Sequence, residues 1–458
     1  MADRPEDEST WRRVLGLAAP TLAQQVILFL IQQYDQWLAS GFQPEHRAAL
    51  TTANYLYWFI SSYSVVVSAG ATALVGRMVG AKDWTTANRA AAQAMLLAVG
   101  FGLAATVLAW FGLPWLMAAL RLEAPAADIA VSYLSALILV LAIQMLETGG
   151  IACLVGAGNT WIGPAIFGLV ALLNAPLAWM LSGHAGPSLD FGFTGIAIGT
   201  AISHAIGGVV VLVVLFRGLS GLKLTATMFV PNAGLLVRLL RISVPAALDS
   251  LSSACCQLYF LSIVNKLGIS ASSAHGIALR WEALGYLAGG GFAPTAMAVV
   301  SQSLGQKRPD LAARGGWMCF GLGSAVMCLM GLCFYVLAWP MCRLHTQSED
   351  ELAMAVASLR LIAFAMPAVA AWIILTAALR AAGDTRVPVV ITWLGFLGLR
   401  IPLALFLTQA QVEFLGFTAA GANLGLIGAW IAMVSDLYIR GILFVIRFAG
   451  GRWKSIKV

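Results

Sequence analysis

The residues best suited to chemistry in this chain are charged side chains inside long apolar runs. The first is Asp35, which lies about 30 Å along a helix counted from Val14 at roughly 1.5 Å per residue. Thr21, Gln25 and Gln32 recur with it at helical spacing, so these side chains can form one polar stripe. Because a lipid-facing stripe would be unfavourable, we expect it to face a bundle interior or a wet cavity. The alternative is an ordinary interfacial carboxylate among the outer headgroups.

Further charges inside apolar runs are Glu147, Asp249, Glu282, Asp436, Arg280 and Arg400. Since acids outnumber bases, the substrate or coupling ion is expected to be a cation or a proton rather than an anion. Asp249, Glu282, Asp436 and Arg400 belong to the second half and form a candidate polar substrate site. Arg400 is equally expected to pair with Glu282 or Asp436 and simply lock the helices. Glu147 is either a helix-end carboxylate or a cavity group.

Polar neighbours for Asp35 occur in other apolar runs of the first half. Asn174 and Thr200 are one set, and Asn54 and Trp58 lie in a polar second run. We assign Asn54 and Trp58, together with Gln32 and Glu147, to the candidate polar substrate site. A buried carboxyl with amide and hydroxyl neighbours can bind and release a proton, and it can also hold Na⁺. The five histidines and seven cysteines show no metal-ligand spacing, so we expect no cofactor and no metal beyond H⁺ or Na⁺ as coupling ion.

The composition places these charges in a membrane protein. The chain has 458 residues, of which 60% are hydrophobic and 10% charged, and its mean hydropathy is +0.86. Soluble globular proteins do not have this composition. Apolar runs of about 20 residues predict an all-α integral membrane protein with twelve transmembrane helices. The expected spans are 14–39, 50–78, 90–118, 129–156, 160–182, 193–217, 236–265, 273–304, 313–341, 353–380, 386–410 and 423–448.

The basic residues predict the orientation of these spans. Most of the 27 Lys and Arg residues, with Arg440 near the end of the last span counted among them, fall on one side, which is then cytoplasmic and carries both termini. We expect the protein to be multi-pass in the cell (inner) membrane. The net charge of +7 follows from this topology and from anionic lipid, and it requires no nucleic acid. The expected partners are the lipid bilayer and a small-molecule substrate, with the monomer as the functional unit.

An internal repeat predicts two lobes. Residues 79–90, VGAKDWTTANRA, align with residues 304–315, LGQKRPDLAARG, and Gly158 aligns with Gly383. Six helices per half is an even number, so the halves are parallel repeats suited to rocking around a central site, or else to a rigid scaffold. The Gly and Pro run at 288–294 favours movement, although Gly also serves close packing. The predicted parts are a tail at 1–13, an N-lobe at 14–217, a cytoplasmic linker at 218–235, a C-lobe at 236–448 and a tail at 449–458.

Short motifs in both halves carry a resemblance to a known family. The first half contains LAAPTLAQQ, YDQWLASG, SAGATALVGRMVGAKD and VGAGNT, and the second half contains ISVPAAL, RWEALGYLAGGGFAPTAMAVVSQSLGQ, LRAAGDT, LRIPLA and LGLIGAWIAM. In this order the sequence resembles the multidrug and toxic compound extrusion (MATE) family across the whole chain. The resemblance implies a two-lobed antiporter that exports organic, often cationic, compounds in exchange for protons or sodium.

The resemblance also assigns residues. Asp35 matches the family's first-helix aspartate, Asn174 its fifth-helix asparagine and Thr200 a sixth-helix threonine, and Glu282 matches an R-x-E pattern in the eighth helix. The resemblance therefore implies ion coupling at the first three residues. The departures are Ala178, Ser253 and Val369, which stand where many members or subgroups carry acids.

Two other function classes fit the sequence less well than efflux. A flippase or exporter of lipid-linked sugars from the same superfamily should have a basic cavity, which the excess of acids disfavours. An enzyme is disfavoured because no nucleophile-base motif appears, and nothing resembles a channel selectivity filter. We therefore expect a secondary active efflux transporter that works by alternating access and is not an enzyme.

Overall fold

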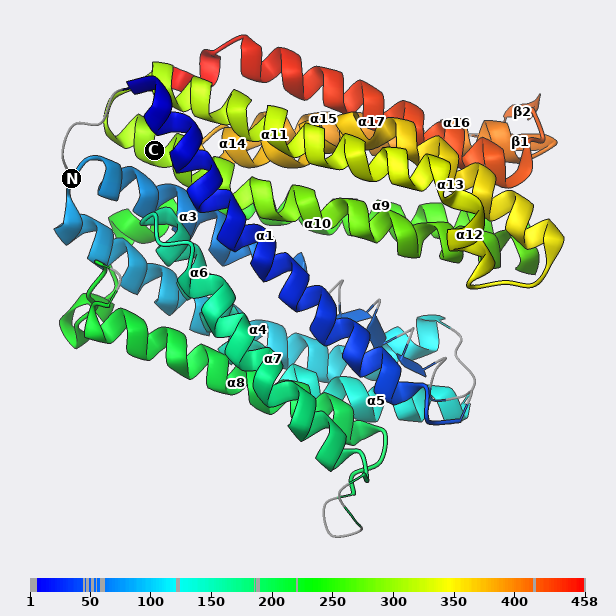
Figure 1. Cartoon of the computed structure of the whole chain (residues 1–458), viewed down its shortest axis with the longest axis horizontal. Coiled ribbons are helices and arrows are strands. Elements are labelled where there is room, and N and C mark those ends of the chain that lie inside the picture. Colours follow the sequence, from blue (N-terminus) through cyan, green and yellow to red (C-terminus); the bar gives the residue numbers. More distant parts are fainter. Residues whose placement is uncertain are drawn as a thin grey trace. The chain divides into compact units, whose positions relative to one another are not determined.

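The computed structural model describes residues 6–456 apart from 44–45, 47–48, 51–52, 55, 58–61, 121–123, 185, 187–189, 220 and 415–416. The chain is helical through most of this length (Figure 1). The first half contains α1 (Glu6–Ala39), α3 (Val65–Gly80), α4 (Trp84–Leu120), α5 (Ala124–Leu139), α6 (Leu141–Gly156), α7 (Ile162–Leu181), α8 (Thr194–Arg217) and the short η2 (Ala226–Phe229). The second half contains α9 (Ala233–Asn265), α10 (Ile269–Gly305), α11 (Pro309–Val336), α12 (Ala338–Arg343), α13 (Glu349–Ala370), η3 (Ala371–Leu375), α14 (Thr376–Ala381), α15 (Arg386–Gly395), η4 (Phe396–Arg400), α16 (Ile401–Thr408), β1 (Gln411–Phe414), β2 (Phe417–Ala420), α17 (Gly425–Ala449) and η5 (Arg452–Ser455).

The long helices confirm a multi-pass membrane protein. Within the described residues, ten helices are long and apolar enough to cross a membrane, and the bent pair α5 and α6 makes an eleventh if it is one span. Large apolar side chains such as Phe111 (78% exposed) and Leu172 (75% exposed) cover their outer faces, as expected for helices that contact lipid. The predicted span 50–78 is described mainly by α3, and part of it lies outside the described residues. The prediction of an all-α membrane fold is confirmed, with the addition of the short hairpin β1–β2.

The chain divides into two compact units. One contains Leu15–Ala247 together with Ser301–Arg308, and the other contains Leu248–Val300 and most of the chain after Pro309. We call them the first and second unit. The predicted boundaries of the N-lobe, linker and C-lobe stay a prediction.

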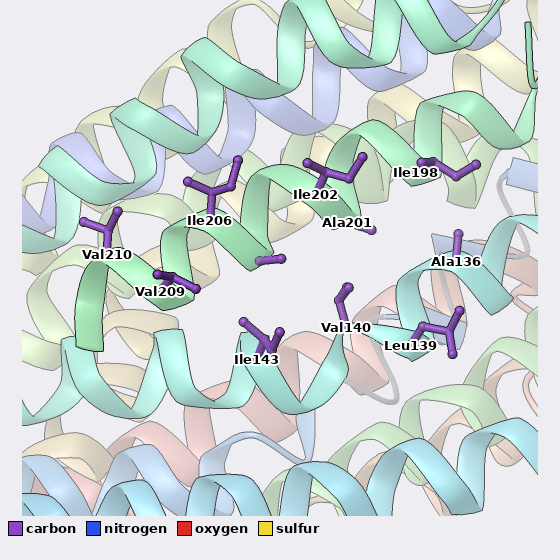
Figure 2. Close-up of a pocket in the computed structure, with 11 residues that line it drawn as sticks. Ala136, Leu139, Val140, Ile143, Ile198, Ala201, Ile202, Ile206, Val209 and Val210 are labelled. Atoms are coloured by element: carbon purple, nitrogen blue, oxygen red, sulfur yellow. The ribbon is translucent and has the colours of Figure 1, made fainter. Parts of the chain in front are cut away.

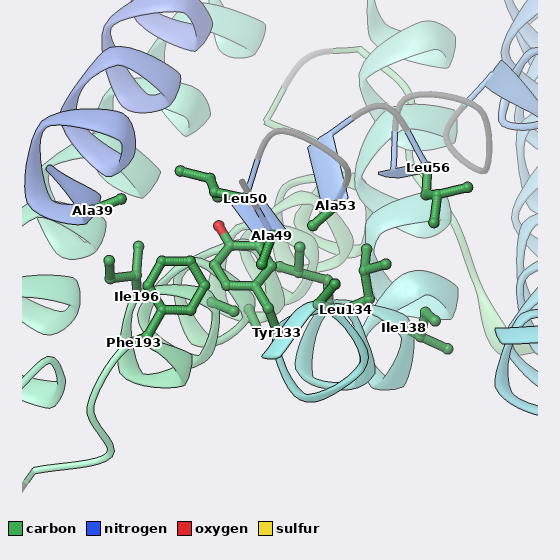
Figure 3. Packing of buried hydrophobic residues seen from close by; sticks show 14 of the residues in the cluster. Ala39, Ala49, Leu50, Ala53, Leu56, Tyr133, Leu134, Ile138, Phe193 and Ile196 are labelled. Atoms are coloured by element: carbon green, nitrogen blue, oxygen red, sulfur yellow. The ribbon is translucent and has the colours of Figure 1, made fainter. Parts of the chain in front are cut away.

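In the first unit α6 packs against α3, α4 and α8, while α8 also packs against α5 and α7. The predicted span 129–156 is bent by 51° between α5 and α6. Thr106 Oγ1 reaches the Ile138 carbonyl at 3.3 Å next to this bend, and a side chain inserted into the helical ladder is a known cause of kinks. A buried apolar cluster contains residues of both α5 and α8. In this cluster the ring centroids of Tyr133 and Phe193 are 5.2 Å apart, and Figure 3 shows the two rings side by side.

In the second unit α13 packs against α11 and α17, and α16 packs against α17 (Figure 1). Two π-helical segments interrupt these helices: η3 follows Pro367, and η4 precedes Pro402. Proline lacks a backbone N–H and disturbs the regular ladder, and single π turns are frequent at functional sites. The hairpin pairs Gln411 with Ala420 in antiparallel register beyond the end of α16.

The internal repeat predicted from the sequence is visible in the backbone. Lys82 and Lys307 both have positive φ, 61° and 59°, although neither is glycine. Gly158 and Gly383 have φ of 91° and 90°. In both halves an equivalent backbone hydrogen bond closes the turn at this glycine. Asn159 N donates to Leu154 O in the first half, and Asp384 N donates to Leu379 O in the second. Such unusual conformations recurring at aligned positions support a duplication.

The glycine run at 288–294 does not interrupt its helix, because α10 continues through Pro294 to Gly305. The run serves close packing instead. A Cβ at Gly289 would lie 2.8 Å from Ile373 Cδ1, and one at Gly285 would lie 3.0 Å from Met366 Sδ. Of the two roles expected for these glycines, the structure shows packing against neighbouring helices.

The predicted linker is held against α4. Gln93 Nε2 donates to the carbonyls of Met228 and Val230 at 2.8 and 3.0 Å, and Gln93 Oε1 accepts from Asn232 N at 2.9 Å. The Gln93 side chain is buried, so it satisfies three backbone groups at once. Asn88 on the same helix accepts from Lys223 N at 3.0 Å. The segment after α8 is therefore fixed by one α4 face.

We expect Gln93→Ala to destabilise the protein by about 1–3 kcal/mol, because three backbone groups lose their partner. Thermal unfolding in detergent should show a lower midpoint than wild type. Gln347→Ala, which replaces an exposed glutamine, is the control and should leave the midpoint unchanged. Equal midpoints for the two variants would contradict the anchoring role of Gln93.

Candidate functional site

Asp35, Asn174 and Thr200 meet inside the first unit and come from α1, α7 and α8. Thr200 Oγ1 donates a hydrogen bond to Asp35 Oδ2 at 3.0 Å, and Asn174 Nδ2 donates to Thr200 Oγ1 at 2.8 Å. All three residues are buried, with Asp35 only 8% exposed. The structure thus brings together the residues assigned to the ion site, while their role in ion binding stays a prediction.

Close backbone packing places these helices. A Cβ at Gly199 would lie 2.5 Å from Ala178 N, so α7 and α8 touch through their backbones just before Thr200. Tyr34 OH donates to Ala175 O at 3.1 Å and so fixes α1 against α7 next to Asp35. Ala178 itself is fully buried in the apolar cluster. Asp35 is therefore the acid of this hydrogen-bonded group, with no second carboxylate at position 178.

The Asp35 carboxylate is only partly satisfied. Its Oδ1 atom is buried and has no hydrogen-bond partner, whereas Oδ2 accepts from Thr200. An orphaned carboxylate oxygen inside a membrane protein is unfavourable, and binding a proton or a cation relieves it. The arrangement is therefore suited to reversible ion binding.

Glu147 is also buried in the first unit, and its partner could not be identified from the sequence. Its Oε2 atom lies 2.7 Å from His204 Nδ1, and Glu147 is 1% exposed. Of the two interpretations given for Glu147, the buried pair favours an interior group over a helix-end carboxylate. One turn earlier on α6, Gln144 Oε1 accepts from Tyr57 OH at 2.6 Å. The sequence signal that could have pointed to His204 is its position one helical turn after Thr200, which places the two side chains on the same face of one helix.

The other first-half candidates do not join the Asp35 group. Gln32 is exposed and Asn54 is half-buried, and Trp58 lies outside the described residues. Thr21 is buried, but its hydroxyl donates to carbonyls of its own helix at Leu17 and Ala18. The predicted stripe along α1 is thus not a continuous buried network.

In the second unit Asp436 lies between two arginines. Arg400 Nε donates to Asp436 Oδ2 at 2.8 Å, and Arg440 Nε and Nη2 donate to Oδ1 and Oδ2 at 2.7 and 2.6 Å. The Phe396 ring lies against both guanidinium groups, 4.4 Å from Arg400 and 4.5 Å from Arg440. The expected pairing of Arg400 with Asp436 is present. Arg440 was counted with the cytoplasmic charges, but it is fully buried in α17 because it pairs with Asp436 one turn before it.

The remaining second-half candidates differ in their partners. Asp249 is paired with Arg380, Nη2 to Oδ2 at 2.5 Å. Glu282 is buried on α10 and accepts from Tyr286 OH at 2.9 Å, and its Oε2 atom has no hydrogen-bond partner. Ser253 and Val369 stand where subgroups of the resembled family carry acids, and Val369 is fully buried among apolar side chains. Membership of Asp249, Glu282, Arg400 and Asp436 in a substrate site stays a prediction.

An apolar groove of about 480 Å³ lies beside the polar group and is separate from it. Its lining comes from α5, α6, α8 and the bend between the first two, and every lining residue is aliphatic. Figure 2 shows Ala201 and Val209 of α8 on the side of the helix towards Val140 and Ile143. One face of α8 thus lines the groove with aliphatic residues, whereas Thr200 and His204 of the same helix make polar contacts. Among the described residues, no group of three or more His, Cys, Asp or Glu is placed to hold a metal ion.

Comparison with known proteins gives matches along most of the chain. The family model MatE matches residues 20–180 and 245–406. A protein of Thermotoga maritima named probable multidrug resistance protein NorM is 23% identical over 448 residues, covering 97% of this chain and 93% of the relative.

Solved structures share the fold. A MOP superfamily transporter from Pyrococcus furiosus, described as having a binding pocket of reverse polarity that suggests a different function, superposes with a TM-score of 0.87 at 19% identity and covers 98% of both chains. A multidrug resistance MATE family transporter in an outward-facing conformation superposes with a TM-score of 0.84 at 19% identity, covering 98% of this chain and 100% of the other. Both similarities show that the fold is shared.

Proposed function

Because the chain belongs to the MatE family of transporters, we propose that it exports organic, cationic or amphipathic compounds by antiport with protons. Alternating access between its two repeated halves would move the substrate, without a cofactor and without chemical change. We place the protein in the cell (inner) membrane with both termini cytoplasmic, acting as a monomer. The Thermotoga maritima relative, named a probable multidrug resistance protein, supports efflux of this kind.

The Asp35 group carries the proposal. Its carboxylate is buried, one oxygen lacks a partner, and the other accepts from the hydroxyl of Thr200, which in turn accepts from Asn174. The acid thus accepts from the O–H of Thr200, and the N–H of Asn174 donates to Thr200, so these contacts form a chain of hydrogen bonds rather than a cage of oxygen ligands. That chemistry favours a proton over Na⁺, since hard cations are held by several oxygen atoms.

The Asp35 group supports a cationic substrate, whereas the ion pairs of the second unit do not. Asp249 pairs with Arg380, and Asp436 pairs with both Arg400 and Arg440, so this second cluster keeps one excess positive charge. Asp35 has hydroxyl and amide neighbours, and Glu282 has a tyrosine neighbour, so neither is paired with an arginine by hydrogen bonds. Asp35, whose hydrogen-bonded neighbours Thr200 and Asn174 are uncharged, attracts cations in a low-dielectric interior.

The test is transport of ethidium, an organic cation, in proteoliposomes under one imposed gradient at a time. We expect a proton gradient to drive ethidium transport and a sodium gradient alone to drive none above protein-free liposomes. Transport on the sodium gradient alone would identify Na⁺, rather than the proton, as the coupling ion. Absence of transport on either gradient would remove ethidium-type cations from the substrates and favour a specific exporter or a flippase for lipid-linked compounds.

A further inference from the structure

The Glu147–His204 pair is an ionisable group that the proposed cycle does not yet use. Glu147 Oε2 and His204 Nδ1 lie 2.7 Å apart, and the side chains are 1% and 14% exposed. The other carboxylate oxygen, Glu147 Oε1, is buried without a hydrogen-bond partner. The Phe167 ring lies edge-on to the imidazole, with ring centroids 6.2 Å apart. The pair is therefore held in a largely dry place between α6 and α8.

The packing around the pair leaves space for the Glu147 carboxylate. A Cβ on Gly207 would lie 2.4 Å from Glu147 Oε1 and 2.8 Å from Val170 Cγ2, so glycine at this position makes room for the carboxylate. A buried carboxylate beside one imidazole is most stable when the imidazole is protonated on both nitrogens, because the two opposite charges then compensate each other. Nδ1 faces Glu147, so Nε2 is the atom that gains or loses a proton.

The pair is linked to the Asp35 group. His204 follows Thr200 by one turn of α8, and Thr200 is the hydrogen-bond donor of Asp35. α7, which packs against α8, contains no titratable side chain. Among the described side chains, the other charged or titratable groups on these helices are Arg77 of α3, Arg89 of α4, Cys153 of α6, Asp128 and Tyr133 of α5, Arg217 of α8, and Arg12, Arg13, Tyr34 and Asp35 of α1.

We propose that Glu147 and His204 form a second proton-binding site of the first unit, which exchanges protons in concert with Asp35. This proposal rests on the proposed proton antiport and extends it to α6 and α8. When the Asp35 carboxyl gives up its proton, the O–H bond breaks and the same proton forms the N–H bond at Nε2 of His204. The result is an imidazolium that donates from Nδ1 to the Glu147 carboxylate. Opposite charges on His204 and Asp35 stabilise this state, so the two sites titrate as a coupled system.

The first test observes the histidines directly and needs no transport. Nitrogen NMR of detergent-purified protein with labelled histidine should show His204, assigned by its loss in His204→Gln, with the neutral ring protonated at Nδ1 and with a titration in the pH range of transport. Glu147→Gln should weaken the preference for the Nδ1–H tautomer, because the amide oxygen is a weaker acceptor than a carboxylate and the amide NH₂ can instead donate to Nδ1. Asp35→Asn should change the His204 signals, because the negative charge that the proposal couples to His204 is gone. His275, which is more deeply buried and has no hydrogen-bond partner for its ring nitrogens, is an internal reference and should not respond to either variant.

The second test is ethidium transport driven by a proton gradient in proteoliposomes. Glu147→Gln and His204→Gln should each lose most of the gradient-driven component, and Gly207→Ala, which keeps both ionisable groups but displaces the carboxylate, should change its pH profile. His184→Gln, an exposed histidine of the same unit, is the control. A His204 that does not titrate, or an unchanged pH profile in both Gln variants, would overturn the proposal. If wild type moves no ethidium, the proposed function fails while the NMR experiment still decides whether the proton site exists.

Discussion

Asp35→Asn should abolish proton-driven ethidium transport and reduce it to the level of protein-free liposomes. Asparagine keeps the size of the side chain, and its Oδ1 can still accept from Thr200, so the contact between α1 and α8 should survive. It has no ionisable group, so it cannot bind and release a proton during the cycle. The protein should therefore fold and bind ethidium while losing the coupled step. Transport, ethidium binding and thermal midpoint measured on one preparation separate these effects.

Two matched variants make the Asp35 experiment specific. Asp128→Asn removes an exposed carboxylate from α5 of the same unit and should leave transport unchanged. Asp35→Glu retains an ionisable group at a longer reach and should keep part of the coupling. Thr200→Val removes the donor of the Asp35 hydrogen bond while preserving shape, so it should alter the pH profile of transport. Full proton-driven transport by Asp35→Asn would move the coupling site away from this residue.

The sequence was sufficient to predict features that repeat or that follow from hydropathy. Apolar run lengths predicted most spans to within a few residues, as for α9 (predicted 236–265, found Ala233–Asn265) and α17 (predicted 423–448, found Gly425–Ala449). The duplication was predicted from aligned letters, and paired positive φ values at Lys82 and Lys307 support it. Both signals are local, or repeat at a fixed separation, and neither depends on which side chains touch.

Partner choice was the part that could not be predicted. Two buried pairs, Asp249 with Arg380 and Glu147 with His204, join residues far apart in the chain, and helical periodicity carries no information about which helix faces which. Arg440 illustrates a second limit. Its position near the end of a run predicted a cytoplasmic charge, but burial between Trp372 and Phe396 and pairing with Asp436 hold it inside. The Gly and Pro run in α10 gave two possible roles, and only the facing side chains showed which one applies.

Asp436→Asn should strongly destabilise the folded protein. It leaves Arg400 and Arg440, 3% and 0% exposed, without their shared carboxylate, and Arg440 Nη1 already lacks a hydrogen-bond partner. Removing one member of a buried ion pair typically destabilises by about 3–5 kcal/mol, because the remaining charge is buried without compensation. The aromatic rings at Phe396 and Trp372 offset only a part of this loss.

A matched control for Asp436→Asn exists in the same unit. Asp384→Asn removes the partner of Arg447, whose side chain is 22% exposed and can regain water, so we expect a loss of about 1 kcal/mol or less. Expression yield and thermal midpoint in detergent should therefore fall much further for Asp436→Asn than for Asp384→Asn. Equal midpoints would mean that water or Gln257, which already accepts from Arg400 Nη1, compensates both arginines. In that case the cluster would be open to solvent and available to a substrate, whereas a large difference identifies it as the structural lock of the second unit.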